Sequence, residues 1–529
     1  MRVRLLPLCS LLLALGVRAQ EAPDLVVEGD VPAEGEFFEV PFEVPAGTAE
    51  LQIAHRALDD GDILDFGVMS PEGFRGYGGG NAEDAIVGEA ASSRSYLPGP
   101  LPAGPWSLYV GKAKVNSAAP RYRVEVSFRT AATLPPATDR APWSDTPLAT
   151  EARFYAGDLH VHSADSGDAR PPLAEIADYA RGRGLDFVVV SDHNTHDQVE
   201  RIGAAQPDHP ELLFVPGVEF TTYAGHGLGF GATQFVDHRI GWQGRTLQQA
   251  LDELSAQGAL FSINHPALNL GDACIGCAWE HETPPIGSLH GVEIETGGWR
   301  QAGRLFAFDA IALWEQLLDE GHHLAPLGGS DDHQAGQGNS SPIGDPTTLV
   351  FAEGLSVAAL RQGILDSRTV VKLQGPDDPM IVLDTDVARV GDTVAAAELT
   401  FTATVTGGVG ARFRFVKGGL GVELPVEITE DPQVFTLAAT PEGGPGDRVR
   451  AEVQVDDGGE LVPRTLTGYV WLTPAAPGPC ACTSAGTVGG VGSLTGRASA
   501  GPGPGLLAGA LALGVAISAR PRRWGPRAG

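Results

Sequence analysis

Cysteine is scarce in this chain: five of its 529 residues are cysteines, and only Cys274 and Cys277 lie in its body. The segment Cys274-Ile-Gly-Cys277 has no second CxxC to accompany it, which disfavours a zinc knuckle. The βαβ context that a thioredoxin-like redox motif needs is also missing. We therefore expect Cys274 and Cys277 to form a local disulfide that closes a loop, as such pairs do in exported proteins.

Basic residues are also few relative to acidic ones. Lys and Arg number 36 against 66 Asp and Glu, which gives a formal net charge of -30. Residues 1–19 and the stretch after Cys482 carry Arg without any acid, so the acidic excess is concentrated between two basic ends. Such a surface repels nucleic acid and anionic lipid. We expect no nucleic-acid partner and a soluble protein outside the cytoplasm.

Long hydrophobic runs are absent too. The apolar run 5–17 is shorter than the about 20 residues that span a bilayer. It follows the basic start Met1-Arg-Val-Arg and precedes the small-residue site Val17-Arg-Ala19, which is the form of a secretory signal peptide over residues 1–19.

The C-terminal stretch 476–529 has an unusual order of features. Cys480-Ala-Cys482 is followed by a Gly/Ser-rich spacer, the short apolar run 505–519 and a cluster of arginines from Arg520 to Arg527. This order resembles the MYXO-CTERM class of bacterial C-terminal sorting tails. The resemblance implies that the tail is removed and that the protein is left anchored at the cell surface.

Glycine and proline, at 70 and 40 residues, favour β-rich modules with many turns. Residues 121–128 alternate apolar and polar side chains, as in a half-buried strand, and residues 449–455 do the same. We expect a β-sandwich over residues 20–148 and an immunoglobulin-like one over 376–475. Neither module shows a chemical constellation, so both are interpreted as scaffold or adhesion modules.

Residues 149–375 have an α/β character, because helical patterns alternate with short apolar runs. The run 185–190 leads into Asp192-His193-Asn194, the run 259–263 into Asn264-His265-Pro266, and the run 324–327 into Asp331-Asp332-His333. In a parallel α/β barrel the carboxyl ends of the strands meet at one face, where the chemistry lies. These polar clusters are therefore predicted to converge.

Histidine is concentrated in this region: thirteen of the fourteen histidines lie between residues 160 and 333. His160-Val-His162 on a strand directs both imidazoles to one face. Glu219, after another apolar run, is well placed to bridge two ions. Histidine and carboxylate are the preferred ligands of zinc, manganese and iron, so the sequence predicts one multinuclear metal site.

The order of these motifs (HxH, a downstream Asp, DHN, Glu, His, NHP and SDxH) resembles the PHP (polymerase and histidinol phosphatase) superfamily of metallohydrolases over residues 153–372. With its flanking β modules the chain is similar to the CehA/McbA-like branch, which includes a carbamate-ester hydrolase. The resemblance implies a distorted (β/α)7 TIM-like barrel that holds two to three divalent ions (Zn, Mn or Fe).

The resemblance also implies nine metal ligands in three overlapping sets: His160, His162, Glu219 and Asp331 for a first ion; Glu219, His226 and His265 for a second; Asp168, His193 and His333 for a third. Two positions stay open. Asp165 is a rival of Asp168, and His238 is a rival of His226. Asp158, Asn194, Asn264 and Gln334 are candidates to support the ligands, and Asp332 is expected to face away.

Hydrolysis is the predicted reaction, because a hydroxide that bridges two ions forms at neutral pH and can attack phosphorus or carbonyl carbon. Asp331 or Glu219 would take the proton, and Arg300, with Arg304, is a candidate clamp for a substrate anion. The leading hypothesis is an exported phosphoesterase that acts on a small or phosphorylated substrate. Its alternatives are a carboxyl or carbamate ester or amide hydrolase and a surface protein that binds or scavenges metal.

Overall fold

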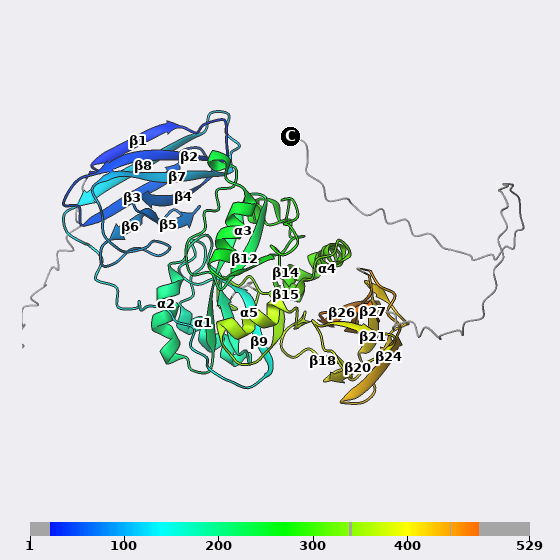
Figure 1. Cartoon of the computed structure of the whole chain (residues 1–529). Helices are drawn as coiled ribbons and strands as arrows, with labels where there is room; N and C mark the ends of the chain where they lie inside the picture. The colour runs from blue at the N-terminus through cyan, green and yellow to red at the C-terminus, as the bar shows by residue number, and fades with distance from the viewer. Residues whose placement is uncertain (1–21, 338–340, 445, 476–529) are drawn as a thin grey trace, which may run out of the picture.

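The computed structural model describes residues 22–337, 341–444 and 446–475 (Figure 1). The predicted signal peptide and sorting tail lie outside these residues, as do Cys480 and Cys482. Within the described part, the chain is a mixed α/β protein, rich in strands, with several sheets. In that part, no helix has both the length and the apolar character to cross a bilayer.

The N-terminal module, blue in Figure 1, consists of two four-stranded antiparallel sheets. The first has the order β1 (Leu25–Asp30), β8 (Arg121–Arg129), β3 (Glu50–Ala57), β6 (Ala85–Gly88). The second has the order β2 (Phe37–Val44), β7 (Gly104–Lys114), β4 (Ile63–Ser70), β5 (Gly73–Gly79). Both sheets contribute to one buried cluster, which includes Leu51, Val68, Trp106 and Val124. The strict alternation of buried and exposed residues along β2 follows from its pattern Phe-Glu-Val-Pro-Phe-Glu-Val.

The central region is built on a run of strands that are neighbours in one sheet: β9 (Arg153–Val161), β10 (Phe187–Val190), β11 (Leu213–Thr222), β12 (Gly225–Phe230), β13 (Leu260–Ile263), β14 (Gly291–Thr296) and β15 (Ala325–Gly329). Backbone hydrogen bonds from Asp331 N–H to His160 and from His162 N–H to Asp332 also join the end of β15 to β9. β15 therefore lies beside β9 as well as β14. The antiparallel strands β16 (Thr347–Ala352) and β17 (Thr369–Lys372) extend the sheet beyond β9.

Five α-helices accompany these strands: α1 (Leu173–Gly182), α2 (Gln198–Ala205), α3 (Leu247–Ala256), α4 (Arg304–Asp319) and α5 (Val357–Leu365). Short helical turns are η1 (Gln206–Asp208), η2 (Trp242–Gly244), η3 (Gly271–Ala273) and the π-helix η4 (Gly298–Gly303). The helices predicted from apolar spacing are confirmed: α1 buries Leu173, Ile176, Ala177 and Ala180. Thr246 and Gln249 form a capping box at the start of α3, where the apolar pattern begins.

One strand departs from the parallel pattern that the sequence predicts. β12 runs antiparallel to both β11 and β13, whereas β9–β10–β11 and β13–β14–β15 are parallel. Tyr223 and Ala224 form a tight turn between β11 and β12, and Gly225, at φ 151°, permits it. A hairpin thus replaces one expected helical crossover. The closed (β/α)7 barrel and the two sandwiches remain predictions.

The C-terminal region shares the sheet of the central region, because β17 pairs with β26 (Glu460–Thr467). Beyond β26 follow β25 (Arg448–Asp457), β21 (Arg412–Lys417) and the short β22 (Leu420–Gly421), with β23 (Val426–Glu427), β27 (Val470–Pro474) and β19 (Thr393–Ala396) off this path. A separate sheet has the order β18 (Met380–Thr385), β20 (Leu399–Thr406), β24 (Gln433–Ala439). The boundary predicted at residues 375/376 therefore lies where hydrogen-bonded strands continue from one region into the next.

Candidate metal centre

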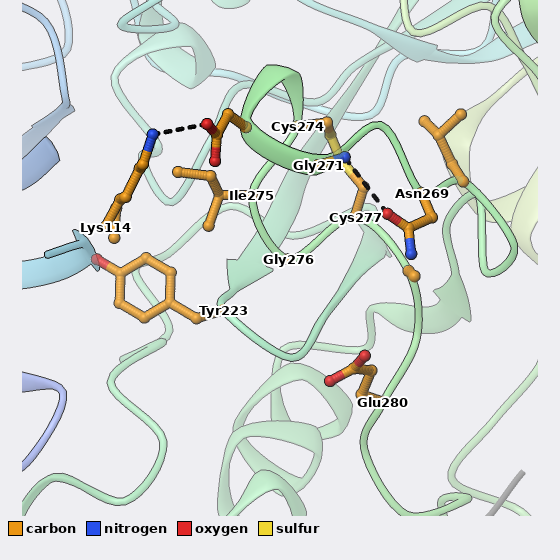
Figure 2. Close-up of a pocket in the computed structure, with 13 residues that line it drawn as sticks. Lys114, Tyr223, Asn269, Gly271, Cys274, Ile275, Gly276, Cys277 and Glu280 are labelled. Carbon is orange, nitrogen blue, oxygen red and sulfur yellow. Dashed lines mark hydrogen bonds and ion pairs between the residues drawn. A yellow bond between two sulfur atoms is a disulfide. The ribbon is translucent and has the colours of Figure 1, made fainter. Parts of the chain in front are cut away.

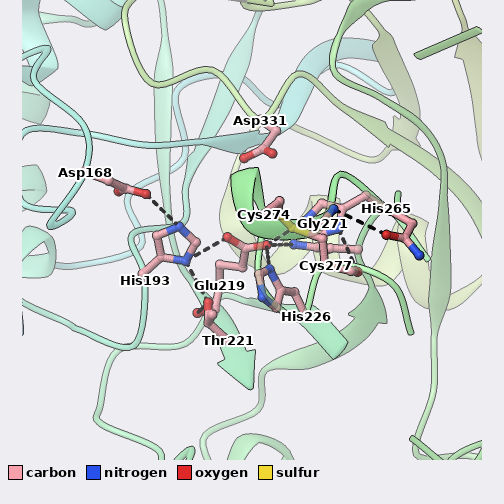
Figure 3. The surroundings of a disulfide bond; sticks show 12 residues. Asp168, His193, Glu219, Thr221, His226, His265, Gly271, Cys274, Cys277 and Asp331 are labelled. Atoms are coloured by element: carbon pink, nitrogen blue, oxygen red, sulfur yellow. Dashed lines mark hydrogen bonds and ion pairs between the residues drawn. A yellow bond between two sulfur atoms is a disulfide. The ribbon is translucent and has the colours of Figure 1, made fainter. Parts of the chain in front are cut away.

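All nine predicted ligand residues lie together, at the ends of the central strands. His160 is on β9 and His162 follows it, His193 follows β10, and Glu219 is on β11. His226 is on β12, His265 follows β13, Asp331 and His333 follow β15, and Asp168 lies in the loop between β9 and α1. Figure 3 shows several of them around Glu219, which lies between His193 on one side and His226 and His265 on the other. The convergence predicted from strand ends is therefore observed.

The innermost donors are His160, His162, Glu219 and Asp331. Nε2 of His160 lies 3.3 Å from Glu219 Oε2 and 3.3 Å from Asp331 Oδ1. Nε2 of His162 lies 3.4 Å and 3.2 Å from the same two oxygens. Ligand atoms about 2.1 Å from a tetrahedral ion are about 3.4 Å from one another, so this spacing fits a divalent cation.

Hydrogen bonding does not account for these close approaches. Nε2 of His160, Nε2 of His162 and Oε2 of Glu219 are buried and lack a partner in hydrogen-bonding geometry within the described chain, although they lie at ion-pair distance from one another. Buried polar atoms normally find such a partner. A shared cation would satisfy all of them, so the donor set fits a metal ion.

A second group, made up of His162, Asp168, His193 and His333, is more open to solvent. Oδ2 of Asp168 lies 3.3 Å from Nε2 of both His193 and His333. The Asp168 side chain is 53% exposed and those of the two histidines 19% and 24%, whereas the inner pair His160 and His162 is sealed. This group therefore forms the accessible side of the centre.

The third group surrounds the other oxygen of Glu219. Oε1 lies 2.9 Å from His265 Nε2 and 3.2 Å from His226 Nδ1. Cys277 lies beside the two histidines, with donor atoms of all three within 4.8 Å of one another. Cys277 is joined to Cys274 in the disulfide predicted from the sequence, and its carbonyl lies 3.2 Å from His265 Nδ1 (Figure 3).

A pocket of about 240 Å³ borders this third group from outside (Figure 2). Cys274 and Cys277 of the disulfide loop line it, together with Glu280, with Tyr223 and with Lys114 of the N-terminal module. Cys277 therefore borders both the pocket and the third group.

Charges in the centre reinforce one another. Burial alone would raise the pKa of Glu219, but His160, His193 and His226 hold it well below its usual value. Burial likewise opposes protonation of His160, yet Glu219, Asp331 and Glu293 raise its pKa well above the usual value. The Glu219 carboxylate thus stays ionised at neutral pH and remains competent as a metal ligand.

Backbone strain is concentrated at the same place. Asn194, His265 and Asp331 have φ angles of 49°, 27° and 56°, in the left-handed region that side chains with a Cβ rarely adopt. Such conformations persist where surrounding contacts determine them, and they are common at functional sites. Asn194 is held by two bonds with Thr221: its Nδ2 donates to the carbonyl and its Oδ1 accepts from the N–H, each at 2.9 Å.

Sequence reasoning missed two groups that orient the ligands, Glu293 and Thr221. Oε2 of Glu293, on β14, lies 3.3 Å from His160 Nδ1 and accepts the His265 N–H at 3.0 Å. Thr221 Oγ1 lies 2.6 Å from His193 Nδ1. The signal was the run Val292-Glu-Ile-Glu-Thr296, where two acids interrupt an apolar strand that is buried throughout. An acid at such a position needs a polar partner inside the fold.

Asp158, a candidate to support the ligands, does so through backbone groups. Its carboxylate accepts backbone N–H bonds from His160, Ser330 and Gly344 at 3.0, 3.0 and 2.7 Å, so it ties together three segments rather than fixing an imidazole. Burial raises its pKa to about 6. Among the other candidates, Asn264 Nδ2 donates to Glu219 Oε1 at 3.3 Å, whereas Gln334 is exposed. Asp332 accepts the backbone N–H groups of Gln334 and Gly336.

The two rival ligands lie elsewhere. Asp165 is buried against Arg201, with Oδ1 2.9 Å from Nε. His238 is enclosed by aromatic rings, among them Tyr77, whose centroid is 4.7 Å away, and Tyr109. The geometry therefore favours Asp168 over Asp165 and His226 over His238.

The predicted anion clamp is not assembled. Arg300 is exposed on η4, and within the described residues its side chain forms no hydrogen bond or ion pair with the cluster. Arg304, at the start of α4, instead pairs with Asp457 and Glu460 of the C-terminal region at 3.1 and 3.5 Å. Catalytic participation of Arg300 stays a prediction.

Comparison with known proteins adds little. No family model matches the chain, and no curated protein matches it. Among solved structures, a candidate metal-dependent phosphoesterase from Bifidobacterium adolescentis is 14% identical, with 40% of this chain and 95% of that chain covered, at a TM-score of 0.24. The CARDB domain of a Pyrococcus furiosus protein is 16% identical, with 18% and 95% covered, at 0.13. A calcium-binding mutant of Bacteroides uniformis beta-glucuronidase 2 is 10% identical, with 85% and 61% covered, at 0.19. All three TM-scores lie below 0.5, so these likenesses identify no function for this chain.

Proposed function

We propose that this protein is a metal-dependent hydrolase of the PHP type, with a distorted (β/α)7 barrel as its catalytic region and phosphoesters as its substrates. The observation that carries the proposal is the division of Glu219: Oε2 faces His160 and His162, and Oε1 faces His226 and His265. A carboxylate placed between two sets of imidazoles is suited to bridge two ions, as a multinuclear hydrolase requires.

Three sets of residues would hold the ions: His160, His162, Glu219 and Asp331; Glu219, His226 and His265; Asp168, His193 and His333. Divalent ions bound there supply Lewis acidity and a water acidified toward neutral pH. The metal itself stays open in this proposal to zinc, manganese or iron, all of which accept imidazole and carboxylate ligands.

The chain's own groups favour catalysis over storage of metal. Structural sites are closed by protein ligands, whereas catalytic sites leave a position open. Here the inner imidazoles are sealed, but the side chains of Asp331 and Asp168 are 21% and 53% exposed. A substrate would enter from that side. Asp331, the accessible carboxylate of the inner set, is the group placed to accept a proton, with Glu219 as the buried alternative.

Phosphoesters are preferred over carboxyl and carbamate esters because of the resemblance to the PHP superfamily, since ions of this kind activate either centre. The test is a hydrolysis panel on the full-length chain loaded in turn with Zn, Mn and Fe. Chromogenic phosphate mono- and diesters are compared with carboxyl and carbamate esters. His160→Ala is the inactive control, and His209→Ala changes a histidine outside the cluster. Phosphoester turnover that His160→Ala abolishes supports the proposal, whereas turnover of carbonyl esters alone contradicts it. Inactivity on both classes would favour a metal-binding surface protein.

Export and surface anchoring belong to the same proposal, on the strength of the predicted signal peptide at 1–19 and the MYXO-CTERM-like tail at 476–529. Expression of the full-length chain in a Gram-negative host of the kind that uses such tails, followed by cell fractionation and mass spectrometry of the mature ends, tests both. Retention in the cytoplasm with both ends intact would contradict them.

A further inference from the structure

The N-terminal module contacts two segments that carry or flank ligands of the metal centre. One is the loop that carries Asp168, and the other is the turn between β11 and β12, which separates Glu219 from His226. The sequence had suggested only a scaffold or adhesion role for this module. The contacts below connect it directly to ligand-bearing segments.

Arg94, in the segment after β6, binds the Asp168 loop through its guanidinium. Nη1 donates to the carbonyls of Ser166 and Ala169 at 3.1 and 2.7 Å, and Nη2 donates to that of Gly167 at 2.9 Å. These carbonyls lie on both sides of Asp168 in the chain. The charge of Arg94 strengthens each bond, and its planar fork fixes their relative positions.

Ser95 makes a second contact with the same loop. Its Oγ donates to the Asp165 carbonyl at 2.7 Å, and the residue is completely buried. Its φ of 70° lies in the left-handed region, as do those of several residues in the metal centre. Gly167 of the loop packs against Gly78 on β5 so closely that a Cβ on Gly167 would collide with the Gly78 carbonyl. The backbones of Gly167 and Gly78 are therefore in direct contact.

Asp168 lies in a loop, outside any helix or strand, and Arg94 binds the residues on either side of it. Within the loop, Ser166 Oγ donates to Asp168 Oδ1 at 2.7 Å, which leaves Oδ2 directed at His193 and His333. Among the nine ligand residues, Asp168 has the most exposed side chain, so burial does little to position it.

The second contact is made through Asp65 on β4. Its Oδ2 accepts hydrogen bonds from Tyr223, in the β11–β12 turn, at 2.8 Å and from Tyr77, on β5, at 3.2 Å. Tyr223 thus links the N-terminal module to the turn that follows Glu219 and precedes His226. The module holds ligand segments from two directions.

We propose that the N-terminal β module is an integral part of the outer metal site, formed by Asp168, His193 and His333. Arg94 is a positioning residue that fixes Asp168 for the ion shared with the two histidines. The inference rests on the proposed metal-dependent function, because it concerns one of that site's ions. It predicts that the outer ion is lost selectively when Arg94 is removed, while the inner ions bound around Glu219 are retained.

The test measures metal content and affinity in the full-length chain. Wild type, Arg94→Ala, Arg94→Lys and Asp168→Asn are loaded with Zn or Mn, dialysed and analysed for bound metal, and affinities come from competition with a chromophoric chelator. Arg123→Ala is the matched control, because Arg123 pairs only with Glu28 and Glu125 within the same module. Thermal unfolding of every variant identifies any that fails to fold.

We expect Arg94→Ala to weaken one ion by about 10- to 100-fold, the usual range for groups that orient ligands. Arg94→Lys should lie between it and wild type, since an ammonium cannot reach three carbonyls in a fixed plane. Adding Arg94→Ala to Asp168→Asn should cost little more than Asp168→Asn alone, because both act on one ion. Excess metal should restore the activity of Arg94→Ala.

Several outcomes separate the two proposals. Wild-type metal binding without hydrolysis of any substrate overturns the proposed function but leaves the test of Arg94 intact. Hydrolysis by wild type, with all ions bound equally well by Arg94→Ala, overturns only the role of Arg94. Equal loss of every ion in Arg94→Ala, or an equal loss in Arg123→Ala, also overturns it. Should Arg94→Ala unfold, Arg94→Lys decides by the same criteria.

Discussion

Glu293 contacts the ring nitrogen of His160 that points away from the other ligands: its Oε2 lies 3.3 Å from Nδ1, while Nε2 of the same imidazole faces Glu219 and Asp331. A carboxylate on the far ring nitrogen fixes both the tautomer and the plane of a ligand histidine. Glu293 also accepts the His265 N–H, so one side chain on β14 positions ligands of two sets.

Replacing Glu293 with Gln keeps the size of the side chain and removes its charge. We expect metal affinity and hydrolysis to fall by about 10- to 100-fold. Glu295→Gln is the matched control, because Glu295 lies on the same strand and is buried, and burial raises its pKa well above the usual value. Metal titration and initial rates of hydrolysis, measured on both variants, test this prediction. Equal losses in the two would show that any change on β14 disturbs the centre.

Removal of an inner ligand should have a larger effect. His160→Ala or Asp331→Ala is expected to abolish hydrolysis and reduce bound metal, because each donor faces two others of the same set. The β modules should stay folded, since their buried clusters contain neither residue. Metal analysis, kinetics and circular dichroism of each variant test this, and full activity in either one would refute the inner set.

Metal removal gives a test that needs no substrate. An ion that binds only the folded chain stabilises it according to its concentration, by about 2.7 kcal/mol at a hundredfold excess over Kd. Wild type should therefore lose thermal stability on dialysis against a chelator and regain it with Zn or Mn. In Glu219→Gln, where both sets lose their shared anion, most of this response should vanish. Differential scanning fluorimetry measures it, and an unchanged response of the variant would contradict the bridging role.

Several of the ligands were predictable from sequence because they follow apolar runs. His193, His265 and Asp331 follow the carboxyl ends of parallel strands, and such ends meet at one face of the sheet. Glu293 was not predictable in the same way: it lies inside its strand, and its function depends on the far nitrogen of a histidine about 130 residues away. Only the packed structure shows which face of β14 meets β9.

The antiparallel β12 and the contacts of the N-terminal module were missed for related reasons. A Gly-rich stretch such as His226-Gly-Leu-Gly-Phe230 is compatible with a hairpin or a crossover, and periodicity does not decide between them. Arg94 looks like an ordinary surface arginine in the sequence. Its three carbonyl partners come from a loop some 70 residues later, so no local pattern announces them.

The disulfide gives a prediction about the third group of ligands. Cys277 lies beside His226 and His265, and its carbonyl faces His265 Nδ1, so the loop that the disulfide closes orients that imidazole. The double variant Cys274→Ser/Cys277→Ser should weaken one ion by about tenfold, as loss of an orienting contact does. Cys274→Ser alone leaves a free Cys277 thiol, which is a metal ligand when deprotonated, and should weaken the ion less. Chelator competition on both variants tests this, and wild-type affinity in the double variant would contradict it.

Acid should loosen the contact between the N-terminal module and the central region through His238. The imidazole is buried against Phe37, Tyr77, Tyr109 and Phe235, and burial lowers its pKa to about 3. In the unfolded chain its pKa is near 6.5, so below that pH the unfolded state binds the proton and the folded state does not. Stability from this group is therefore fully present above pH 6.5 and is lost as the pH falls toward 3.

Between pH 7 and pH 5 this one group should lower the free energy of unfolding by about 2 kcal/mol. His238→Phe, which keeps an aromatic ring and cannot be protonated, should lose that much less over the same interval. Urea unfolding of both proteins at the two pH values, followed by tryptophan fluorescence, measures the difference. His55 is buried in the N-terminal module, and burial lowers its pKa to about 4. It contributes the same loss of stability to wild type and to His238→Phe, so it cancels from the difference. Equal losses in wild type and His238→Phe would show that the pKa of His238 is the same in the folded and the unfolded chain.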